Sequence, residues 1–317
     1  MILDFFEGKL DGDSWEEICQ ACYRIRYKEQ HYLEIPAAYR GDAGIEGFTV
    51  DGIVNQCYCP EKDFSDDELY NHQRDKMTAD INKLVSSAYK KRLEDLGVPM
   101  IREWHFVIPY YKDSRIIQHA ETKRREVLSK RDSDPDHFSY IDKDFRIIIK
   151  QAEDFRFEIT GIIRNSYTNT KLNLAVRKVA QPDWTKCDSE KVDNIRRKVA
   201  AVMGDIEDED LDYNEIVDTY IESYIKGLEI LRILRLSYAE IYEDVYQLEQ
   251  AYKKQVKIKT GMNTKQSMNN VIFNEILDDF EKQLKETCGY FTSDSIIELK
   301  VDIVSMWLAD CSMKFRK

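Results

Sequence analysis

The chain has 317 residues, of which 43% are apolar, and it carries a formal net charge of −12 at pH 7. This length and apolar content suffice for a well-buried core and for about two domains. The acidity excludes a surface that attracts anionic polymers everywhere, so any contact with nucleic acid has to come from a local basic patch.

The N-terminus, MILDFFEGKLDGD, has no basic segment followed by a long apolar one. No apolar run approaches the ~18 residues that a bilayer crossing needs. We therefore expect a cytoplasmic protein without a membrane partner. Seven cysteines are an odd number, and without a secretion signal this favours reduced thiols.

The first half of the chain is expected to alternate helices and strands. Residues 13–26 are expected to form a helix, with an N-cap candidate at the start and one apolar face made of Trp15, Ile18, Cys22 and Ile25. A short strand follows at 31–37. Segments 45–50 and 53–59 flank Asp51-Gly52, the dipeptide best suited to a type I′ turn, and are predicted to form a β-hairpin.

The pattern then predicts a helix from about residue 65 to 96, ended by Gly97 and Pro99, and a buried strand over 103–111. Residues 114–131 look helical and include the contiguous cations Lys123, Arg124 and Arg125. A solvated helix face is the more common explanation of such a cluster, and contact with DNA phosphates is the sharper one.

The predicted fold class is α+β: an N-terminal α/β core over 1–131, then a helical bundle over 213–317. Between them, 132–212 is a connecting region in which FRIIIK and FRFEITGII fit either strands or helix, and an acidic loop follows from Asp205. From residue 213 the apolar period is 3.6, with breaks at Gly261 and Gly289. The expected core stripe of this bundle is Tyr220, Tyr224, Ile230, Ile233 and Leu234, although an aromatic face also suits a protein partner.

The common phosphate-loop, dinucleotide, zincin and hydrolase motifs are absent from the sequence. Instead, Trp15-Glu16 on a helix precedes GDAGIEG at 41–47, and a strand carrying Gln56-Cys57-Tyr58 follows. Over about residues 13–62 this order resembles the PD-(D/E)xK restriction-endonuclease-like superfamily. More narrowly it resembles the Mrr-like branch, in which a GDGGIDG-like segment precedes a strand that ends in (E/Q)-x-K. The resemblance implies a metal-dependent DNA endonuclease.

Phosphodiester hydrolysis calls for a divalent cation, and Mg²⁺ or Mn²⁺ prefers hard oxygen ligands. The expected ligands are the carboxylate of Asp42, the amide oxygen of Gln56 and the carbonyl of Cys57, and family order brings Glu16 to the same site. Strand alternation places Gln56 and Tyr58 on one face, with Cys57 and Cys59 on the other. Taken alone, Asp42 between glycines fits an ordinary Asx turn.

The sequence departs from the family pattern at Tyr58, where the family has lysine. A tyrosine, with a pKa of about 10, is neutral at pH 7 and supplies no positive charge. Either a cation from the following segment, Lys62, Arg74 or Lys76, takes its place, or the site has lost cleavage. Two hypotheses follow: an endonuclease of a restriction or anti-phage defence system, or an inactive subunit that binds DNA or scaffolds a partner such as an ATPase. The oligomeric state stays open.

Two further clusters have simpler explanations. Cys19, Cys22, Cys57 and Cys59 offer four thiols for Zn²⁺, but small core cysteines are far more common. The five histidines show no ligand spacing. Of these, His105 lies in an apolar strand and is expected to be a core histidine whose ring nitrogens are hydrogen-bonded.

Overall fold

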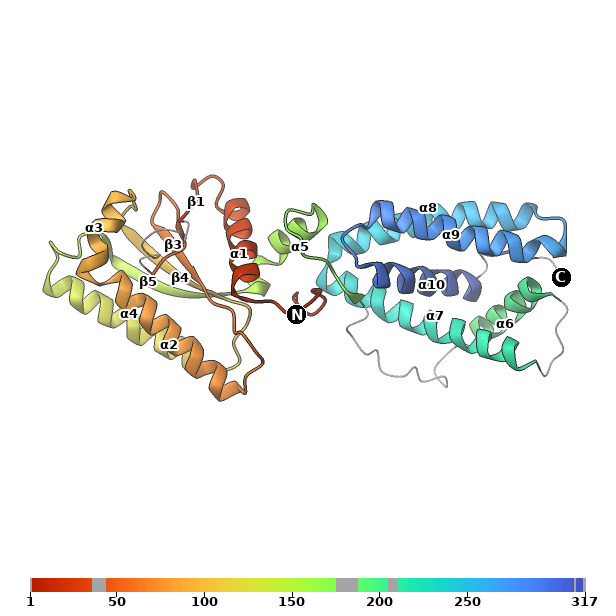
Figure 1. The fold of residues 1–317 in the computed structure, drawn as a ribbon, viewed down its shortest axis with the longest axis horizontal. Coiled ribbons are helices and arrows are strands. Elements are labelled where there is room, and N and C mark those ends of the chain that lie inside the picture. Colours follow the sequence, from red (N-terminus) through yellow and green to blue (C-terminus); the bar gives the residue numbers. More distant parts are fainter. Residues whose placement is uncertain (1, 36–43, 175–187, 205–209, 311, 316–317) are drawn as a thin grey trace. The chain divides into compact units, whose positions relative to one another are not determined.

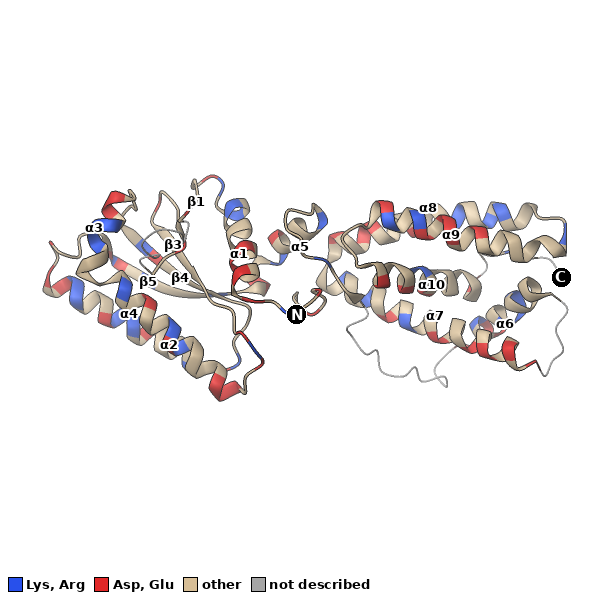
Figure 2. Cartoon of the chain, in the orientation of Figure 1, with Lys and Arg blue, Asp and Glu red and all other residues tan. Residues whose placement is uncertain are grey.

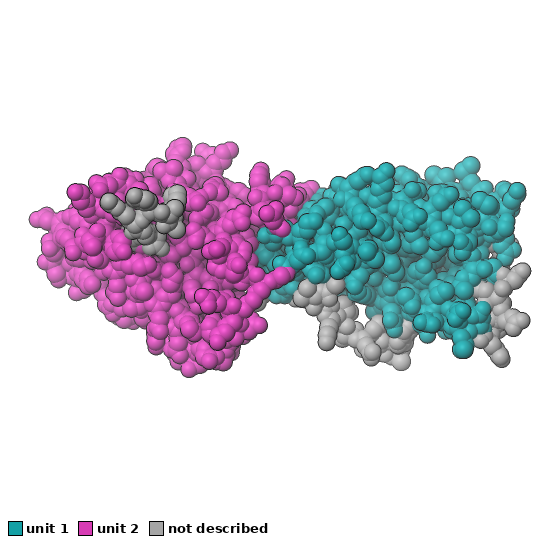
Figure 3. All heavy atoms as spheres, in the orientation of Figure 1, with its two compact units in different colours: residues 1, 3–7, 170–317 teal, residues 2, 8–169 magenta. Residues whose placement is uncertain are grey.

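The computed structural model describes residues 2–35, 44–174, 188–204, 210–310 and 312–315 (Figure 1). The chain divides into two compact units, coloured separately in Figure 3. The sheet unit contains residues 2 and 8–169, and the bundle unit contains 3–7 and the described residues from 170 onward. The expected α+β class is confirmed, with a mixed sheet in the N-terminal part and helices in the C-terminal part.

The sheet has five strands in the order β1-β2-β3-β4-β5. Their bounds are Leu33–Glu34, Gly47–Phe48, Ile53–Cys57, Ile101–Ile108 and Ile141–Gln151. The first three pair antiparallel, and β3, β4 and β5 pair parallel. The predicted hairpin is therefore confirmed as β2 and β3, but its turn is not the expected two-residue type I′ turn. The Thr49 N–H donates to the Ile53 carbonyl, so three residues lie between the paired positions, and Asp51 lacks the positive φ that a type I′ turn requires. Gly52 in its turn has φ 91°, and a Cβ there would lie 2.3 Å from the carbonyl oxygen of Met100, so the turn requires glycine.

Helices cover both faces of this sheet. The helices of the sheet unit are α1 Gly12–Arg26, α2 Asp66–Leu84, α3 Ser87–Asp95, α4 Arg115–Ser133 and α5 Arg156–Arg164. On one face, Val54 and Phe106 pack in a common core with Met77 of α2 and Val127 of α4. On the other face, α1 contacts both β3 and α5.

The single helix expected over 65–96 is wrong, because two helices occupy this range. α2 ends at Leu84. Ser86 then has an extended backbone conformation, and its side-chain hydroxyl accepts a hydrogen bond from the Ala88 N–H. That serine is an N-cap and starts α3, which ends just before Gly97 as predicted. Apolar periodicity continued across the break, so it did not reveal the new cap.

The connecting region 132–212 has defined structure on both sides of its gaps. FRIIIK lies in β5 and FRFEITGII lies in α5, so the sheet unit extends to residue 169 and not to 131. Residues 170–174 and α6, Ser189–Met203, belong to the bundle unit. The acidic tract falls partly outside the described residues, and its Asp210 caps the next helix.

The helical character predicted from residue 213 onward is confirmed, although the bundle unit also includes residues 3–7, 170–174 and α6. Its helices after α6 are α7 Leu211–Ser237, α8 Ala239–Met262, α9 Asn269–Thr287 and α10 Ser293–Ala309. α10 packs against α6, α7 and α9. Of the expected core stripe, Ile230, Ile233 and Leu234 are buried, while Tyr220 is partly exposed and meets the ring of Phe273 edge-on. Tyr224 is also partly exposed.

None of the helices in the described part of the chain combines the length and the hydropathy that a bilayer crossing requires.

Candidate functional site

A pocket of about 610 Å³ opens in the sheet unit where β3 ends, between the first turns of α1 and the middle of α2. Its lining is strongly acidic, with five carboxylates: Asp11, Asp13, Glu16, Glu46 and Glu61. Lys76 is the only lysine or arginine among the described residues that line the pocket, and His72 also lines it. Such a lining attracts cations and repels phosphate groups.

Glu46 is the buried carboxylate of this pocket, with 7% of its surface exposed. Sheet pairing fixes its backbone, because its N–H donates to the Asn55 carbonyl at 2.7 Å and its carbonyl accepts the Ile35 N–H at 2.8 Å. Its side chain accepts two hydrogen bonds from β3, one from the Cys57 N–H at 2.9 Å and one from the Gln56 side-chain amide. Burial raises the pKa of Glu46 to about 8, despite the Cys57 contacts that oppose the shift.

Gln56 lies beside this carboxylate and is 1% exposed. Its Nε2 donates to Glu46, whereas its Oε1 has no hydrogen-bond partner among the described residues. A buried amide oxygen without a partner costs about 1–3 kcal/mol, so its retention calls for an explanation. The orphaned oxygen and the Glu46 carboxylate are both hard oxygen donors.

Glu16 reaches the same pocket from α1, as family order implied. The neighbouring Trp15 anchors the helix, because its buried indole N–H donates to the Val107 carbonyl at 3.1 Å. Glu16 itself accepts the side-chain amide of Gln20 at 2.9 Å. Its negative charge contributes to the raised pKa of Glu46, which indicates that the two carboxylates lie close together.

Tyr58 and Cys57 point to opposite sides of the strand, as alternation predicted, but Cys57, Tyr58 and Cys59 all line the pocket, whereas Gln56 does not. Tyr58 packs on the core beneath α2 and α4, and its ring stacks on Phe106 with centroids 6.4 Å apart. Cys57 faces the other way, toward Cys19 of α1. Burial raises the pKa of Tyr58, so the phenol stays neutral.

Lys76 of α2 is the one cation of the three proposed substitutes that lines the pocket. Its Nζ forms an ion pair at 2.7 Å with Asp80 Oδ2, without hydrogen-bond geometry, and its charge lowers the pKa of Glu46. Lys62 instead lies over the Phe64 ring, 5.3 Å from its centroid. Arg74 pairs with Asp75 at 2.7 Å. Neither of these two lines the pocket.

Asp42, the residue that the sequence favoured as metal ligand, lies outside the described residues. Glu46 was not singled out, although it closes the same GDAGIEG segment. Strand register identifies Glu46. It directly precedes β2, and its N–H donates to the Asn55 carbonyl, so the pairing of β2 with β3 extends to Glu46. A carboxylate at that position faces the end of β3.

The three cations of α4 are all paired on their own helix. Lys123 contacts Glu126 at 2.7 Å, and Arg124 and Arg125 each contact Glu121 at 2.8 Å. These pairs fit the solvated-face explanation, and a role in DNA contact remains an untested prediction.

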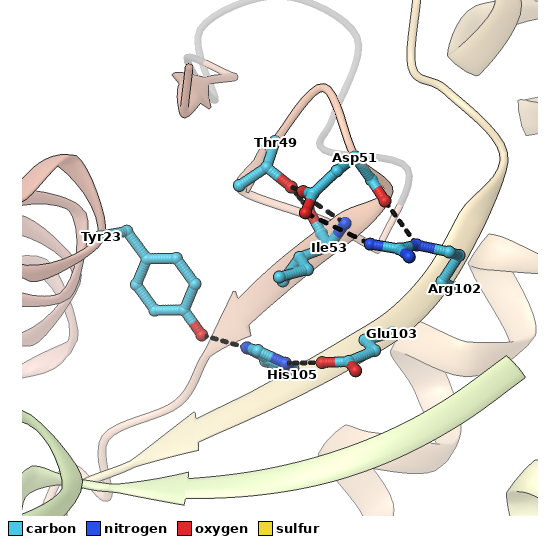
Figure 4. A network of polar contacts seen from close by, with 7 residues as sticks. All are labelled: Tyr23, Thr49, Asp51, Ile53, Arg102, Glu103 and His105. Carbon is cyan, nitrogen blue, oxygen red and sulfur yellow. Dashed lines mark hydrogen bonds and ion pairs between the residues drawn. The ribbon is translucent and has the colours of Figure 1, made fainter. Parts of the chain in front are cut away.

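His105 is a core histidine with both ring nitrogens hydrogen-bonded, as expected (Figure 4). Nδ1 contacts the Tyr23 hydroxyl at 2.7 Å, and Nε2 contacts Glu103 at 2.9 Å. Burial lowers the pKa of His105, which therefore remains neutral. Figure 4 also shows Arg102 bound to Asp51, which ties the hairpin turn to β4.

The thiols near the pocket do not form a zinc site. Burial raises the pKa of both Cys19 and Cys57, which keeps these thiols protonated. In the described residues no group of three or more His, Cys, Asp or Glu side chains is arranged to hold a metal ion. A metal at this pocket therefore has to rely on amide, carbonyl and water oxygens in addition to its carboxylates.

Comparison of the chain with models of protein families, with curated proteins and with solved structures finds no match. The chemistry of the pocket is therefore inferred from its own geometry.

Proposed function

We propose that this pocket is the active site of a metal-dependent DNA endonuclease. The observation that carries the proposal is the buried Glu46 carboxylate, which lines the pocket together with Glu16 and Lys76 and accepts a hydrogen bond from Gln56. Gln56 itself lies behind Glu46 and does not line the pocket, and its Oε1 has no hydrogen-bond partner among the described residues. This arrangement agrees with the resemblance to the PD-(D/E)xK superfamily, with Glu46 in the acidic position. The proposed role in restriction or anti-phage defence rests on that resemblance alone.

The donor set fits Mg²⁺ or Mn²⁺. Mg²⁺ is usually held by one or two carboxylates and keeps several waters, which suits Glu46 and Glu16 with the amide oxygen of Gln56 and the carbonyl of Cys57. When bound, such an ion polarises the phosphoryl group and activates water. Glu46 retains free lone pairs after its two hydrogen bonds, because a carboxylate has about four acceptor sites.

Lys76 takes the role of the missing lysine in this proposal. Asp80 is buried and pairs with both Lys76 and Lys83, so the Lys76 ammonium is held at the pocket. There it provides the positive charge next to a scissile phosphate that the neutral Tyr58 cannot provide. A pocket with five carboxylates also repels DNA until cations neutralise it, which is consistent with a strict metal requirement.

The test compares two carboxylates of the same pocket. Cutting of DNA is measured in Mg²⁺ and in Mn²⁺ for Glu46→Gln, which keeps the size of the side chain but removes its charge. We expect a loss of about 100-fold or more, because a metal ligand is lost. The exposed Glu61, changed to Gln, is the matched control and should cut within about twofold of wild type. Equal cutting by Glu46→Gln and wild type refutes the role of Glu46 as a metal ligand. Asp42→Ala tests, in the same assay, the metal ligand that the sequence predicts.

The alternative is an inactive subunit that binds DNA or scaffolds a partner such as an ATPase. The stacked, neutral Tyr58 in the position of the family lysine favours it. If wild type is inert with both metals while Tyr58→Lys gains cutting, the subunit hypothesis holds. If wild type cuts, Lys76→Ala should abolish cutting, while Lys62→Ala and Arg74→Ala leave it unchanged.

A further inference from the structure

A second concave surface lies on the bundle unit and is basic. This groove, of about 320 Å³, is lined by Gln250, Lys253, Lys254 and Lys257 of α8, together with Asp310 and Ser312 after α10. Three ammonium groups thus face one carboxylate. Figure 2 shows the lysines of α8 in the half of the helix that leads to its C-terminal end.

Two of these lysines differ from the cations of α4, because neither has an acidic partner in the part of the chain that the structure describes. Lys253 is neutralised, because its Nζ lies 2.5 Å from Asp310 and 3.6 Å from Glu249. Lys254 and Lys257 are exposed, and no carboxylate of the described residues pairs with either of them. They lie three residues apart, on the same face of α8. The groove therefore presents two free ammonium groups in a row.

The surroundings of the groove preserve this positive charge. The carbonyls at the C-terminal end of α10 would otherwise add negative potential, but the buried Lys198 donates to those of Trp307 at 3.2 Å and Leu308 at 2.8 Å. The segment after α10 then runs along the end of α8, where the Lys314 N–H donates to Thr260 at 3.0 Å. The exposed Lys314 side chain adds a further cation at that end.

Helix electrostatics do not account for the two free lysines. Cations stabilise the negative end of a helix only within about its last turn, and in α8 that position is filled by Lys259. Lys254 and Lys257 precede the last turn. Lys259 is also paired, at 2.7 Å from Glu275 of α9, so a bundle-stabilising role is visible there and not in the groove.

We propose that this groove binds the phosphate backbone of nucleic acid. A row of donors along a helix suits a ligand whose charge repeats, and the polar side chains of Gln250 and Ser312 are further hydrogen-bonding partners for phosphate oxygens. Among the described residues that line the groove none is apolar, which disfavours insertion into a lipid surface. The choice of nucleic acid rests on the proposed function, whose acidic pocket needs help from cations elsewhere in the chain to hold DNA.

The test measures binding of the full chain to a short fluorescein-labelled DNA duplex in EDTA, across a salt series. For Lys254→Ala/Lys257→Ala we expect about tenfold weaker binding, a salt slope reduced by about two units, and the same loss for different sequences. The matched control is Lys282→Ala/Lys285→Ala on α9, with the same spacing and charge change at lysines that are paired with Glu286 and Glu281. It should bind like wild type. Thermal melting checks that both variants remain folded.

Equal loss in both double variants, or no loss in either, refutes the groove, as does a wild type that does not bind the duplex. Sedimentation with anionic phospholipid vesicles is the second arm: binding to vesicles that requires Lys254 and Lys257, without binding to DNA, assigns the groove to membranes and overturns the proposal. Because EDTA prevents cutting, an inert active site does not affect this result. Loss of cutting in Glu46→Gln with unchanged binding would separate the two proposals.

Discussion

At the residue scale, the main feature is a carboxylate that the fold holds in an unfavourable place. Glu46 is buried and close to Glu16, and the side chain and N–H of Cys57, the amide of Gln56 and the charge of Lys76 offset part of that cost. A carboxyl group with a raised pKa stabilises the folded state when it is protonated and destabilises it when it is ionised. With a pKa of about 8, Glu46 is mostly protonated at pH 7 in the metal-free protein, and a cation bound at the pocket would favour its ionised form.

This cost predicts a pH-dependent stability around the hairpin of the metal-free protein. The pKa of Glu46 rises from 4.5 to about 8 on folding, so its contribution is complete below about pH 4.5 and is lost as pH rises through 8. Hydrogen exchange at the Cys57 N–H, corrected for the intrinsic rate, should report an opening free energy that falls by a few kcal/mol over this range. In Glu46→Gln the dependence should vanish. A flat profile in wild type contradicts the burial argument.

At the scale of elements, the contact between α7 and α10 combines a glycine with a buried acid. A Cβ on Gly227 would lie 2.9 Å from the Cβ of Asp302, so glycine is what lets these helices approach. Asp302 is 2% exposed, and its Oδ2 has no hydrogen-bond partner among the described residues. Burial raises the pKa of Asp302 to about 7, against the opposing charge of Lys226.

Asp302 should therefore weaken this helix contact as pH rises. Its contribution is complete below the unfolded pKa of 3.8 and is lost as pH passes through about 7. Asp302→Asn keeps the shape without the charge, and should stabilise the bundle by on the order of 2 kcal/mol at pH 8 and little at pH 4. Thermal melting at both pH values measures this. The exposed Asp278→Asn on α9 is the control, and an equal effect of the two substitutions would refute the prediction.

At the scale of the whole molecule, the two units are not simple halves of the sequence. Residues 3–7 belong to the bundle unit, although the sheet unit starts directly after them. Phe5 is 1% exposed and meets the Tyr238 ring edge-on, with centroids 6.1 Å apart, and its carbonyl accepts the Asn173 N–H at 2.6 Å. The chain's first residues therefore complete a core made of helices far along the sequence.

We predict that Phe5→Ala destabilises the bundle and not the sheet. Removing a buried phenylalanine costs about 3–5 kcal/mol, because transfer free energy is lost and a cavity remains. Hydrogen exchange of the full chain should show lower protection in α7 and α8 and unchanged protection in β3 and β4. Phe157→Ala in the sheet unit, where the side chain is 78% exposed, should have little effect anywhere. Loss of protection in β3 and β4 would contradict the prediction, because it would show that Phe5 stabilises the sheet unit.

Local patterns were sufficient for most elements of this fold. The hairpin at Asp51-Gly52, the first helix and the C-terminal helices follow from turn chemistry and apolar periodicity, which neighbouring residues determine. The sequence pattern did not predict the break at Ser86, because a serine cap is a weak signal inside a periodic segment. The sequence pattern left β5 open between strand and helix, because its apolar run fits both, and the pairing with β4 makes it a strand.

The order of residues was enough to predict an α+β protein with a helical C-terminal part, and to single out Glu16, Gln56 and a cation beyond Tyr58. The contact between Glu46 and Gln56 and the position of Lys76, rather than Lys62 or Arg74, at the pocket follow from the folded chain. So does the difference between the paired cations of α4 and the two α8 lysines that have no acidic partner among the described residues. The physical reason is that strand register, burial and ion pairing depend on residues far apart in the chain. Their effect on a charge cannot be read from the residues next to it.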